Sequence, residues 1–508
     1  MSFDRRTFLQ GTAMAAAAMA WPKLVNAQAS VVPVTIDTRQ VTGPLAHIWE
    51  ECVGSDRAAI TLRESWRRDL DRGHREAGIK RVRFHGIFND ELGVYATSML
   101  RRKVDGPNFQ NIDQVYDGLL AHGVSPFVEL SFMPKQLASA DRKFGFYGGN
   151  ISPPASIEAW ADFIKTFVVH LVDRYGLATV KTWPFEVWNE ANLPFFWTGT
   201  QQQYFELYKA TSVAIKSVDA GLQVGGPATA RTEWLPELAA YCAENNAPID
   251  FFSTHVYAGD DQNKLFGATD RYPQTEVIPE AMRRARTKID ATSLRDLPLW
   301  LSEWSSDSPA MIAYVIANCL PNCQAMSHWV LSGTYEELGV SDYILKEGNT
   351  GYSMIAAGGI PKPSFNTYKL LHALGSERLS ATGPVLASRR SDRSVAALVW
   401  NLSDVVQPSG IPDQTTIRTV NGEAKRYQIE IAGAHAGQRV KVSFVDQERG
   451  SAMPAWREMG SPQYLKPEQL NVLRQRAEIP PPTMMKLNAT RQITFDLPPE
   501  AVALVELV

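Results

Sequence analysis

The sequence predicts an α/β fold: a (β/α)8 TIM barrel with an accessory antiparallel β-sandwich domain. Eight apolar runs of strand length alternate with helix-length segments between residues 45 and 375, as expected of parallel β/α units. After residue 376 the runs alternate in polarity or are β-branched, and Gly, Pro and Asn separate them, which is typical of antiparallel sheets. No run is followed by a Gly-rich phosphate-binding turn, so a doubly wound sheet has less support.

The predicted domains follow these changes along the 508-residue chain. Residues 1–29 are predicted to be a twin-arginine-type signal peptide, 30–44 an N-terminal strand that joins the β-sandwich, 45–375 the barrel, and 376–508 the β-sandwich domain. A long loop is predicted for residues 446–482, which are rich in Pro, Gln and Arg.

The barrel strands are predicted from the apolar runs themselves. They are 45–53, 79–85, 125–132, 182–190, 222–229, 249–257, 297–304 and 325–332. Between the fourth and fifth runs, apolar and aromatic residues from Tyr204 to Val218 recur at the i, i+3, i+4 spacing of one helix face. Such a face packs onto a sheet, which supports the alternation of strands and helices.

The N-terminal segment predicts export. Arg5 and Arg6 precede Thr-Phe-Leu, a short stretch of small and apolar residues follows, and Ala27-Gln28-Ala29 has the form of a cleavage site. The paired arginines resemble a twin-arginine signal. The apolar stretch is about half the ~20 residues that span a bilayer, so we expect no membrane anchor. The expected location is periplasmic or secreted.

Composition narrows the possible partners. The chain has 51 basic and 54 acidic side chains, a formal net charge of -3, and this balance gives no electrostatic case for binding nucleic acid. No spacing of His, Cys and acidic residues indicates a metal site, and we expect neither a metal nor an organic cofactor. The sequence does not predict the oligomeric state.

Two glutamates stand at the ends of predicted barrel strands. Glu190 ends the fourth run, within Trp188-Asn189-Glu190, and Glu303 lies at the end of the seventh. Catalytic groups of (β/α)8 barrels lie at these ends. A carboxylate among aromatics is costly to bury, and two that converge match the requirement for glycoside hydrolysis. The competing interpretation is a pair of exposed or Arg-paired carboxylates with no catalytic role.

The motifs around these glutamates resemble one enzyme family. They include Trp188-Asn189-Glu190-Ala191-Asn192-Leu193, Arg83-Phe84-His85-Gly86, Thr254-His255-Val256-Tyr257 and Ser302-Glu303-Trp304. In their order along the chain these motifs resemble glycoside hydrolase family 39 of clan A, which contains β-xylosidases and α-L-iduronidases. The resemblance implies a (β/α)8 barrel with a β-sandwich and a retaining mechanism.

Roles for individual residues follow from that resemblance. It implies Glu190 as general acid/base and Glu303 as nucleophile, with the negative charge of Glu303 raising the pKa of Glu190. The implied substrate-binding residues are Asn189 at the sugar 2-hydroxyl, Tyr257 at the nucleophile, Trp329 as a stacking platform, and His85, His255, Glu336 and Glu337 at ring hydroxyls. Arg83 is expected to pair with the buried carboxylates.

The predicted substrate is a glycoside or oligosaccharide with a terminal β-D-xylosyl residue. An α-L-arabinoside remains open, because Gly333 replaces an acidic residue common in the sugar-contact loop. An α-L-iduronide needs a cation for its carboxylate, and Lys135 and Arg231 keep that alternative open. A non-catalytic carbohydrate-binding protein on the same scaffold is the alternative of another class, but it has no use for both glutamates.

Overall fold

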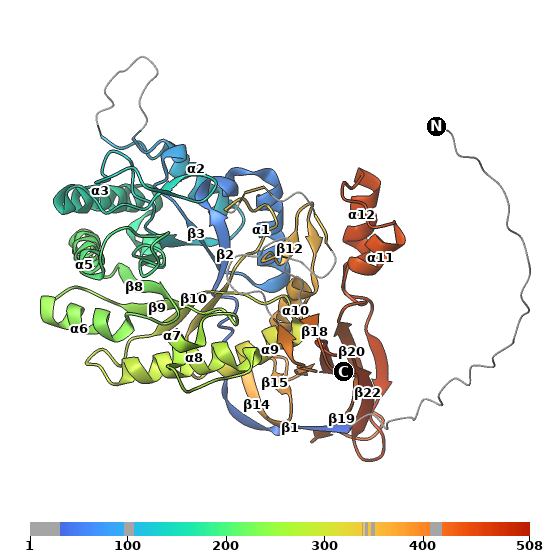
Figure 1. Cartoon of the computed structure of the whole chain (residues 1–508). Helices are drawn as coiled ribbons and strands as arrows, with labels where there is room; N and C mark the ends of the chain where they lie inside the picture. The colour runs from blue at the N-terminus through green and yellow to red at the C-terminus, as the bar shows by residue number, and fades with distance from the viewer. Residues whose placement is uncertain (1–30, 96–105, 338, 341–343, 347–350, 407–418) are drawn as a thin grey trace, which may run out of the picture.

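A closed barrel of eight parallel strands forms the larger part of the molecule (Figure 1). The computed structural model describes residues 31–95, 106–337, 339–340, 344–346, 351–406 and 419–508. The predicted signal peptide lies outside them. In spatial order the barrel strands are β10 (Leu299–Trp304), β11 (Ala325–His328), β2 (Cys52–Arg57), β3 (Arg81–His85), β4 (Ser125–Glu129), β7 (Pro184–Glu186), β8 (Gln223–Ala230) and β9 (Phe251–His255).

A helix follows each barrel strand and covers the outside of the barrel. These helices are α1 (Glu64–Ala77), α2 (Gln110–Ala121), α3 (Ile157–Tyr175), α5 (Gln201–Val218), α6 (Leu235–Asn245), α8 (Gln274–Asp290), α9 (Pro309–Cys319) and α10 (Pro363–His372). The helix predicted around Tyr204–Val218 is α5. Thr200 and Gln203 form a capping box at its N-terminus, which satisfies two backbone N–H groups. Short elements in the loops include α4 (Leu177–Val180), α7 (Gln262–Phe266), β5 (Lys143–Phe144), β6 (Gly149–Asn150), β12 (Ile355–Ala356) and β13 (Ile360–Pro361).

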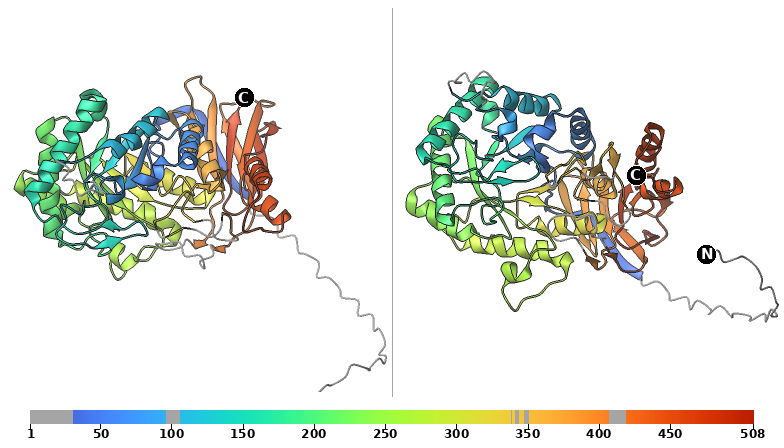
Figure 2. Two further views of the ribbon diagram at one scale, coloured as in Figure 1. Left: turned by 90° about the horizontal axis from the view of Figure 1, so that it is seen from above. Right: turned by 45° about the horizontal axis from the view of Figure 1, so that its top comes forward.

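The second domain is a mostly antiparallel nine-stranded sheet beside the barrel (Figure 2). Its order is β21 (Thr483–Lys486), β20 (Arg439–Val445), β23 (Val502–Leu507), β16 (Val395–Trp400), β15 (Val385–Arg389), β14 (Glu377–Thr382), β1 (Val31–Pro44), β19 (Lys425–Ala432) and β22 (Gln492–Leu497). Phe444 of β20 packs on Phe495 of β22, with ring centroids 5.4 Å apart. The two ends of the sheet therefore face each other around one core, as in the predicted sandwich.

The N-terminal strand belongs to this sheet. β1, which lies within the segment 30–44 where a strand was predicted, pairs antiparallel with β14 and parallel with β19. Among the described residues, none of the helices combines the length and apolar character that crossing a bilayer requires.

Two predictions of local structure were wrong. The first barrel strand is β2, which begins at Cys52; the predicted run 45–53 is largely a turn in which Ile48 and Trp49 are buried. β2 escaped notice because it ends in Ser55, Asp56 and Arg57, polar residues that are buried, with Ser55 accepting a hydrogen bond from Trp66 of α1.

The predicted loop at 446–482 contains two helices, α11 (Met453–Glu458) and α12 (Pro467–Arg476). Trp456 and Leu473 pack in a small cluster with Ala356 and Ile360, which precede α10. These helices bury few apolar residues, so their sequence has only a weak hydrophobic period.

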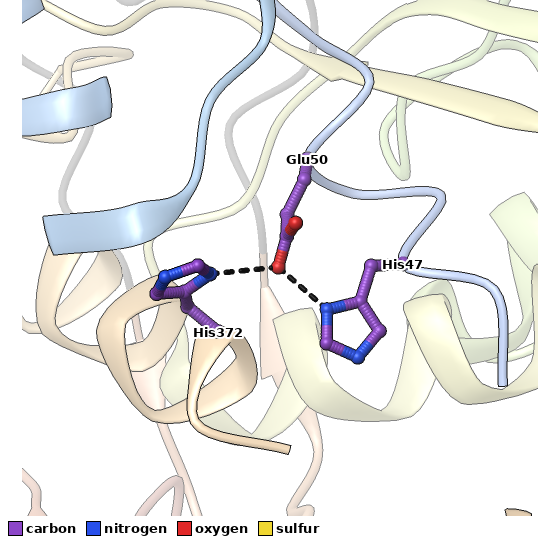
Figure 3. Close-up of side chains that lie close together, drawn as sticks. All are labelled: His47, Glu50 and His372. Carbon is purple, nitrogen blue, oxygen red and sulfur yellow. Dashed lines mark hydrogen bonds and ion pairs between the residues drawn. The ribbon is translucent and has the colours of Figure 1, made fainter. Parts of the chain in front are cut away.

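A histidine–glutamate cluster ties the N-terminal end of the barrel together (Figure 3). The Nδ1 atoms of His47 and His372 lie 2.6 and 2.9 Å from Glu50 Oε1. Nε2 of His47 also contacts the carbonyl oxygen of Gly375, 3.2 Å away, just before β14. The cluster therefore connects the segment before β2, the end of α10 and the start of the sheet domain.

Candidate active site

A cavity opens at the C-terminal ends of the barrel strands, where the predicted glutamates meet. Glu190 follows β7 and Glu303 lies on β10, two strands whose ends are separated by β8 and β9. The cavity has a volume of about 190 Å³. Its lining residues are Phe144, Glu190, Leu193, Phe195, Phe196, Ala230, Arg231, Tyr257, Asp260, Glu303, Trp329, Tyr335, Glu337 and Tyr352.

The turn that carries Glu190 has an uncommon backbone conformation. Trp188 and Glu190 have φ values of 70° and 43°, which residues other than glycine rarely adopt. The indole Nε1 of Trp188 donates to the carbonyl oxygen of Phe196, at 2.9 Å, and the N–H of Glu190 donates to the carbonyl oxygen of Ala228, also at 2.9 Å. Backbone strain of this kind gathers at functional sites. Here the surrounding contacts hold the Glu190 carboxyl in the cavity.

Burial sets the charge state of Glu190. It raises the pKa of Glu190 to about 7, and the positive charges of His85, Arg83 and Arg231 offset only part of that rise. The sequence had suggested the negative charge of Glu303 as the cause, but burial is the largest contribution. Glu190 is therefore protonated over much of the range below neutral pH.

Glu303 is surrounded by donors. Nη1 of Arg83 donates to its Oε2 at 3.1 Å, and the Tyr257 hydroxyl donates to its Oε1 at 2.7 Å. Burial raises the pKa of Tyr257 well above its usual value, so the phenol keeps its proton and remains a donor. The hydrogen bond predicted between Tyr257 and Glu303 is present, and the two donors fix the orientation of the carboxylate.

Arg83 connects the buried polar groups beneath the cavity. It is fully buried, donates to Glu186 at 2.6 Å and Asn189 at 2.8 Å, and lies 2.9 Å from Glu129. Burial disfavours its charge, but the neighbouring carboxylates, Glu186 first, outweigh that effect and raise its pKa. The expected pairing of Arg83 with buried carboxylates is thus present.

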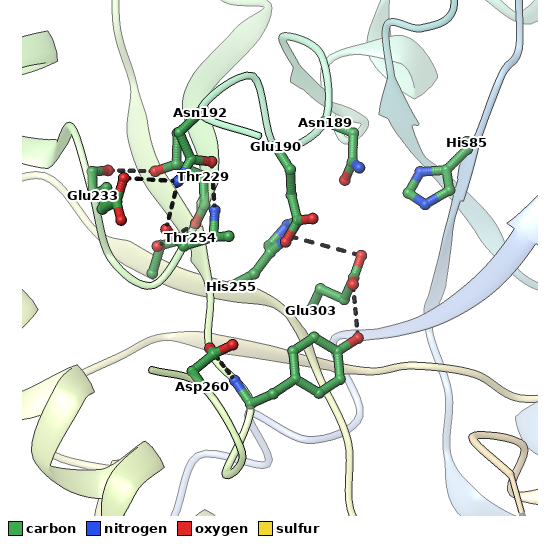
Figure 4. Close-up of polar contacts among 12 residues, drawn as sticks. His85, Asn189, Glu190, Asn192, Thr229, Glu233, Thr254, His255, Asp260 and Glu303 are labelled. Carbon is green, nitrogen blue, oxygen red and sulfur yellow. Dashed lines mark hydrogen bonds and ion pairs between the residues drawn. The ribbon is translucent and has the colours of Figure 1, made fainter. Parts of the chain in front are cut away.

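His255 lies between the two glutamates (Figure 4). Its Nδ1 is 3.0 Å from Glu190 Oε1 and 3.8 Å from Glu303 Oε2. One carboxylate oxygen of each glutamate and a ring nitrogen of His255 all lie within 4.8 Å of one another. Burial lowers the pKa of His255 to about 4, so the ring is neutral when Glu190 is protonated.

On the opposite side, Trp329 and Glu337 line the cavity, and the buried His85 lies against both of them. His85 Nδ1 is 2.8 Å from Glu129, whose charge outweighs the effect of burial and raises the pKa of His85 to about 9. Burial raises the pKa of Glu337 to about 8, and the Tyr335 hydroxyl donates to it at 2.6 Å. The rings of His85 and Trp329 lie 4.7 Å apart. This wall therefore combines a cation, a carboxylic acid and an aromatic surface.

Asn189 and Glu336 have contrasting surroundings. Among the described residues, Nδ2 of Asn189 is buried without a hydrogen-bond partner, and so has a donor to offer. Glu336 instead pairs with Arg57 at 3.1 Å and Arg63 at 2.6 Å, and lies outside the cavity lining. The structure thus does not bring Glu336 to the predicted sugar-contact position. A side chain at Gly333 would overlap the backbone of Ala357, which accounts for the glycine there.

Sequence reasoning did not assign several residues of the cavity a role. These are Phe144, Leu193, Phe195, Asp260, Tyr335 and Tyr352, together with Glu129 and Glu186 beneath it. The lining residues come mainly from loops, where no periodic pattern identifies them. Glu129 and Glu186 do end barrel strands, and that position was an available signal.

Two groups of residues among those described bring possible metal ligands within 4.8 Å of one another. One is Glu190, His255 and Glu303, which is the candidate site itself. The other is His47, Glu50 and His372 at the far end of the barrel. In the second group the 2.6 and 2.9 Å separations are those of direct hydrogen bonds.

Comparisons with known proteins agree with this geometry. The model of the family described as "Glycosyl hydrolases family 39" matches residues 32–487. A beta-xylosidase from Caldicellulosiruptor saccharolyticus is 34% identical, over 92% of this chain and 96% of its own. The crystal structure of a monomeric beta-xylosidase from Caulobacter crescentus CB15 superposes with a TM-score of 0.83 at 32% identity, covering 94% of this chain and 99% of that chain. Human alpha-L-iduronidase is 27% identical over 42% of this chain and 32% of its own length.

Proposed function

This chain belongs to glycosyl hydrolase family 39, and on that premise we propose that it is a retaining glycosidase that releases terminal β-D-xylosyl residues. The observation that carries the mechanism is the pair of carboxylate oxygens, one from Glu190 and one from Glu303, within 4.8 Å. Retaining enzymes hold their two carboxyl groups about 5–5.5 Å apart, and inverting enzymes hold them about 6.5–9.5 Å apart to admit a water molecule. The spacing therefore favours retention.

In the first step Glu303 attacks the anomeric carbon and forms an ester bond to the sugar. The bond from that carbon to the leaving oxygen breaks, and the leaving oxygen takes the proton of Glu190. Glu190 carries this proton below about neutral pH because burial raises its pKa to about 7. Arg83 and Tyr257 hold Glu303 as an oriented anion for the attack.

In the second step Glu190 acts as a base. It takes a proton from a water molecule, whose oxygen attacks the same carbon and displaces Glu303. The sugar leaves with its original anomeric configuration, Glu303 returns as a carboxylate, and Glu190 is protonated again. Asn189 Nδ2 is buried without a partner among the described residues, which supports its proposed role as a donor to the sugar 2-hydroxyl.

The choice of xylose rests on the relatives and on the charges of the cavity. The matched proteins from Caldicellulosiruptor saccharolyticus and Caulobacter crescentus are named beta-xylosidases. An iduronide would bring a carboxylate into a cavity whose lining already includes Glu190, Asp260, Glu303 and Glu337. Among the described lining residues Arg231 is the one Lys or Arg, and it belongs to the wall formed after β8. This arrangement disfavours an acidic sugar in the reacting position.

The size of the cavity supports action on chain ends. Its volume of about 190 Å³ is below the ~300–1,000 Å³ of pockets that hold drug-sized ligands. A cavity of this size suits one sugar ring with the leaving group toward its mouth.

A panel of nitrophenyl glycosides tests the proposed substrate. We expect release of nitrophenol to be fastest from the β-D-xyloside, slower from the α-L-arabinoside, and slowest from the α-L-iduronide. The Glu303→Gln variant, measured beside the wild type, gives the uncatalysed background. Rapid release from another glycoside with none from the xyloside would overturn the choice of sugar.

We also propose that the protein is exported by the twin-arginine route. Arg5, Arg6 and the Ala27-Gln28-Ala29 site support this proposal. Expression of the full chain in a bacterium should yield a periplasmic or secreted product whose N-terminus lies just after Ala29. A double variant, Arg5→Lys with Arg6→Lys, should accumulate uncleaved in the cytoplasm. Equal export of both chains would contradict the route.

A further inference from the structure

The cavity has two sides, defined by the order of the barrel strands. Around the barrel, β8 and β9 lie between β7, which precedes Glu190, and β10, which carries Glu303. His85 on β3 and Trp329 and Glu337 after β11 lie on the other arc. If those residues bind the sugar that reacts, the leaving group, which Glu190 protonates, should bind on the side of the cavity formed after β8 and β9. Arg231 follows β8 directly.

Arg231 is held in place by the loop that carries Glu190. Its Nε donates to Glu233 Oε1 at 3.0 Å, and Glu233 Oε2 accepts from Asn192 Nδ2, also at 3.0 Å. Asn192 stands two residues after Glu190 and also bonds the N–H and the carbonyl of Ala230, each at 3.0 Å. Figure 4 shows Asn192 between Glu190 and Glu233. This network fixes the backbone next to Arg231 relative to Glu190.

The backbone of Arg231 is strained in the same way as that of Glu190. Its φ is 61°, and those of its neighbours Thr232 and Trp234 are 54° and 64°. A left-handed conformation at a residue other than glycine persists where the surroundings enforce it, and such residues gather at ligand sites. Strain at Arg231 therefore points to a role for its side chain in the cavity.

The guanidinium of Arg231 has hydrogen-bond donors that are available to a ligand. It lines the cavity, its side chain is 19% exposed, and among the described residues Glu233 is its one hydrogen-bond partner, through Nε. Both terminal NH2 groups therefore remain available. Since Glu233 already balances the positive charge, a neutral polar ligand suits this position better than an anion does.

An apolar surface lies on the adjoining loop. Leu193, Phe195 and Phe196 follow Glu190 and line the same cavity, and Phe195 is 48% exposed. Phe144 packs on Phe196, with ring centroids 4.3 Å apart. An exposed aromatic ring and free hydrogen-bond donors that line one cavity can bind a sugar ring together, because a sugar has an apolar face and a rim of hydroxyls.

We propose that Arg231 is the specificity residue for the leaving group, and that it donates hydrogen bonds to the hydroxyls of a second sugar ring placed against Phe195. This inference rests on the proposed function and adds the residue that recognises the leaving group: Arg231 should favour a neutral sugar over a leaving group that has no hydroxyls.

The test compares two substrates that share a glycone and differ in the leaving group. The ratio of kcat/KM for the β-linked disaccharide to kcat/KM for the nitrophenyl glycoside is measured in wild type, Arg231→Ala and Arg231→Lys. We expect the ratio to fall about 10- to 100-fold in Arg231→Ala, the loss expected for a charged hydrogen-bond donor. Arg231→Lys should recover part of it. Arg283→Ala, which removes an exposed cation on the outer helix α8 that does not line the cavity, should leave the ratio unchanged.

A second measurement separates recognition of the leaving group from an effect on Glu190. The glycosyl–enzyme formed from the nitrophenyl glycoside is offered the free sugar or methanol as acceptor. Arg231→Ala should transfer less to the sugar and as much as before to methanol. Equal loss with both acceptors, together with an unchanged substrate ratio, would overturn the proposal.

Two further outcomes are informative. If Arg231→Ala harms a carboxyphenyl glycoside more than its carboxamide analogue, Arg231 binds anions and the neutral-sugar proposal is wrong. If wild type cleaves no xyloside, the proposed glycone is wrong, and the same ratio is then measured with the glycone that the panel identifies. The two failures are thereby distinguished.

Discussion

The two ends of the barrel each hold a cluster of histidine and glutamate, and their charge states differ. At the C-terminal end, Glu190, His255 and Glu303 are 7%, 0% and 7% exposed. Burial there raises the pKa of Glu190 to about 7 and lowers that of His255 to about 4, so both neutral forms are favoured. At the N-terminal end, hydrogen bonding to Glu50 raises the pKa of His372, whose side chain is 43% exposed (Figure 3).

The difference shows how surroundings decide what the same residue types do. Burial opposes ionisation of Glu50 too, but hydrogen bonds from His372 and His47 outweigh it and lower the pKa of Glu50. That cluster is a satisfied ion pair, which holds segments together. Glu190 lacks an equally strong cationic partner, so it keeps a proton that it can transfer.

The largest effect on activity is expected from removing the carboxylate of Glu303. Removing the carboxylate of Glu50, at the other end of the barrel, is the matched control. Glu303→Gln should lower kcat/KM by about 10⁴-fold or more, because the nucleophile is lost. Glu50→Gln removes a carboxylate from the other cluster and should leave kcat/KM within about twofold while lowering Tm. Steady-state kinetics and thermal unfolding of both variants check this contrast. An active Glu303→Gln variant would remove the distinction between the two clusters.

Loss of Glu190 should depend on the leaving group. Glu190→Ala should lower kcat about 10²- to 10⁴-fold on glycosides with poor leaving groups, the range of general acid catalysis. On an activated dinitrophenyl glycoside the first step needs little acid assistance, and azide should restore turnover by replacing the water that Glu190 would activate. A variant that hydrolyses poor substrates like the parent, with no response to azide, would exclude Glu190 as the acid/base.

The pH profile should report the state of Glu190. Because the first step needs its protonated form, kcat/KM should fall as pH rises through about 7, the pKa that burial gives Glu190. The fall should weaken with a dinitrophenyl glycoside, which does not need the proton. Rates measured from pH 4 to 9 test this. A fall near pH 4.5 in place of 7 would mean that Glu190 is not buried as described.

The smallest effect is expected at the exposed histidine. The folded-state pKa of His372 is raised, so its stabilising contribution is complete below the unfolded pKa of about 6.5 and is lost as pH rises through the folded value. Solvent screening limits the contribution, so His372→Gln should lower Tm by about 2 °C or less at pH 5.5 and by less at pH 9. We expect kcat/KM to be unchanged in this variant. A larger loss of Tm at pH 9 than at pH 5.5 would contradict the raised pKa of His372.

Much of the fold could be predicted because the barrel strands are apolar runs separated by amphipathic helices. The strands β3, β4 and β7 to β11 lie within or overlap their predicted runs. β2 was misplaced because it ends in Ser55, Asp56 and Arg57, which are polar although they are buried. Helices α11 and α12 were missed because their buried face is small, and only contact with the barrel reveals it.

The candidate site was predictable where chemistry fixes residue type and position. Glu190 and Glu303 stand among aromatic residues at the ends of predicted strand runs. Asn189 and Tyr257 belong to the sequence motifs that accompany these glutamates and His255. Asp260 and Tyr335 come from loops whose path no pattern predicts. Glu336 and Glu337 are neighbours in sequence, yet Arg57 and Arg63 hold Glu336 away from the cavity, a competition that only the structure shows.

Trapping of the covalent intermediate tests the central claim most directly. A 2-fluoro xyloside with an activated leaving group slows both steps, so the glycosyl–enzyme should accumulate with the label on one residue. Peptide mapping by mass spectrometry should place the label on the peptide that contains Glu303, and the Glu303→Gln variant should remain unlabelled. A label on any other carboxylate, or turnover without a covalent intermediate, would contradict the assignment of Glu303 as nucleophile and Glu190 as its acid/base partner.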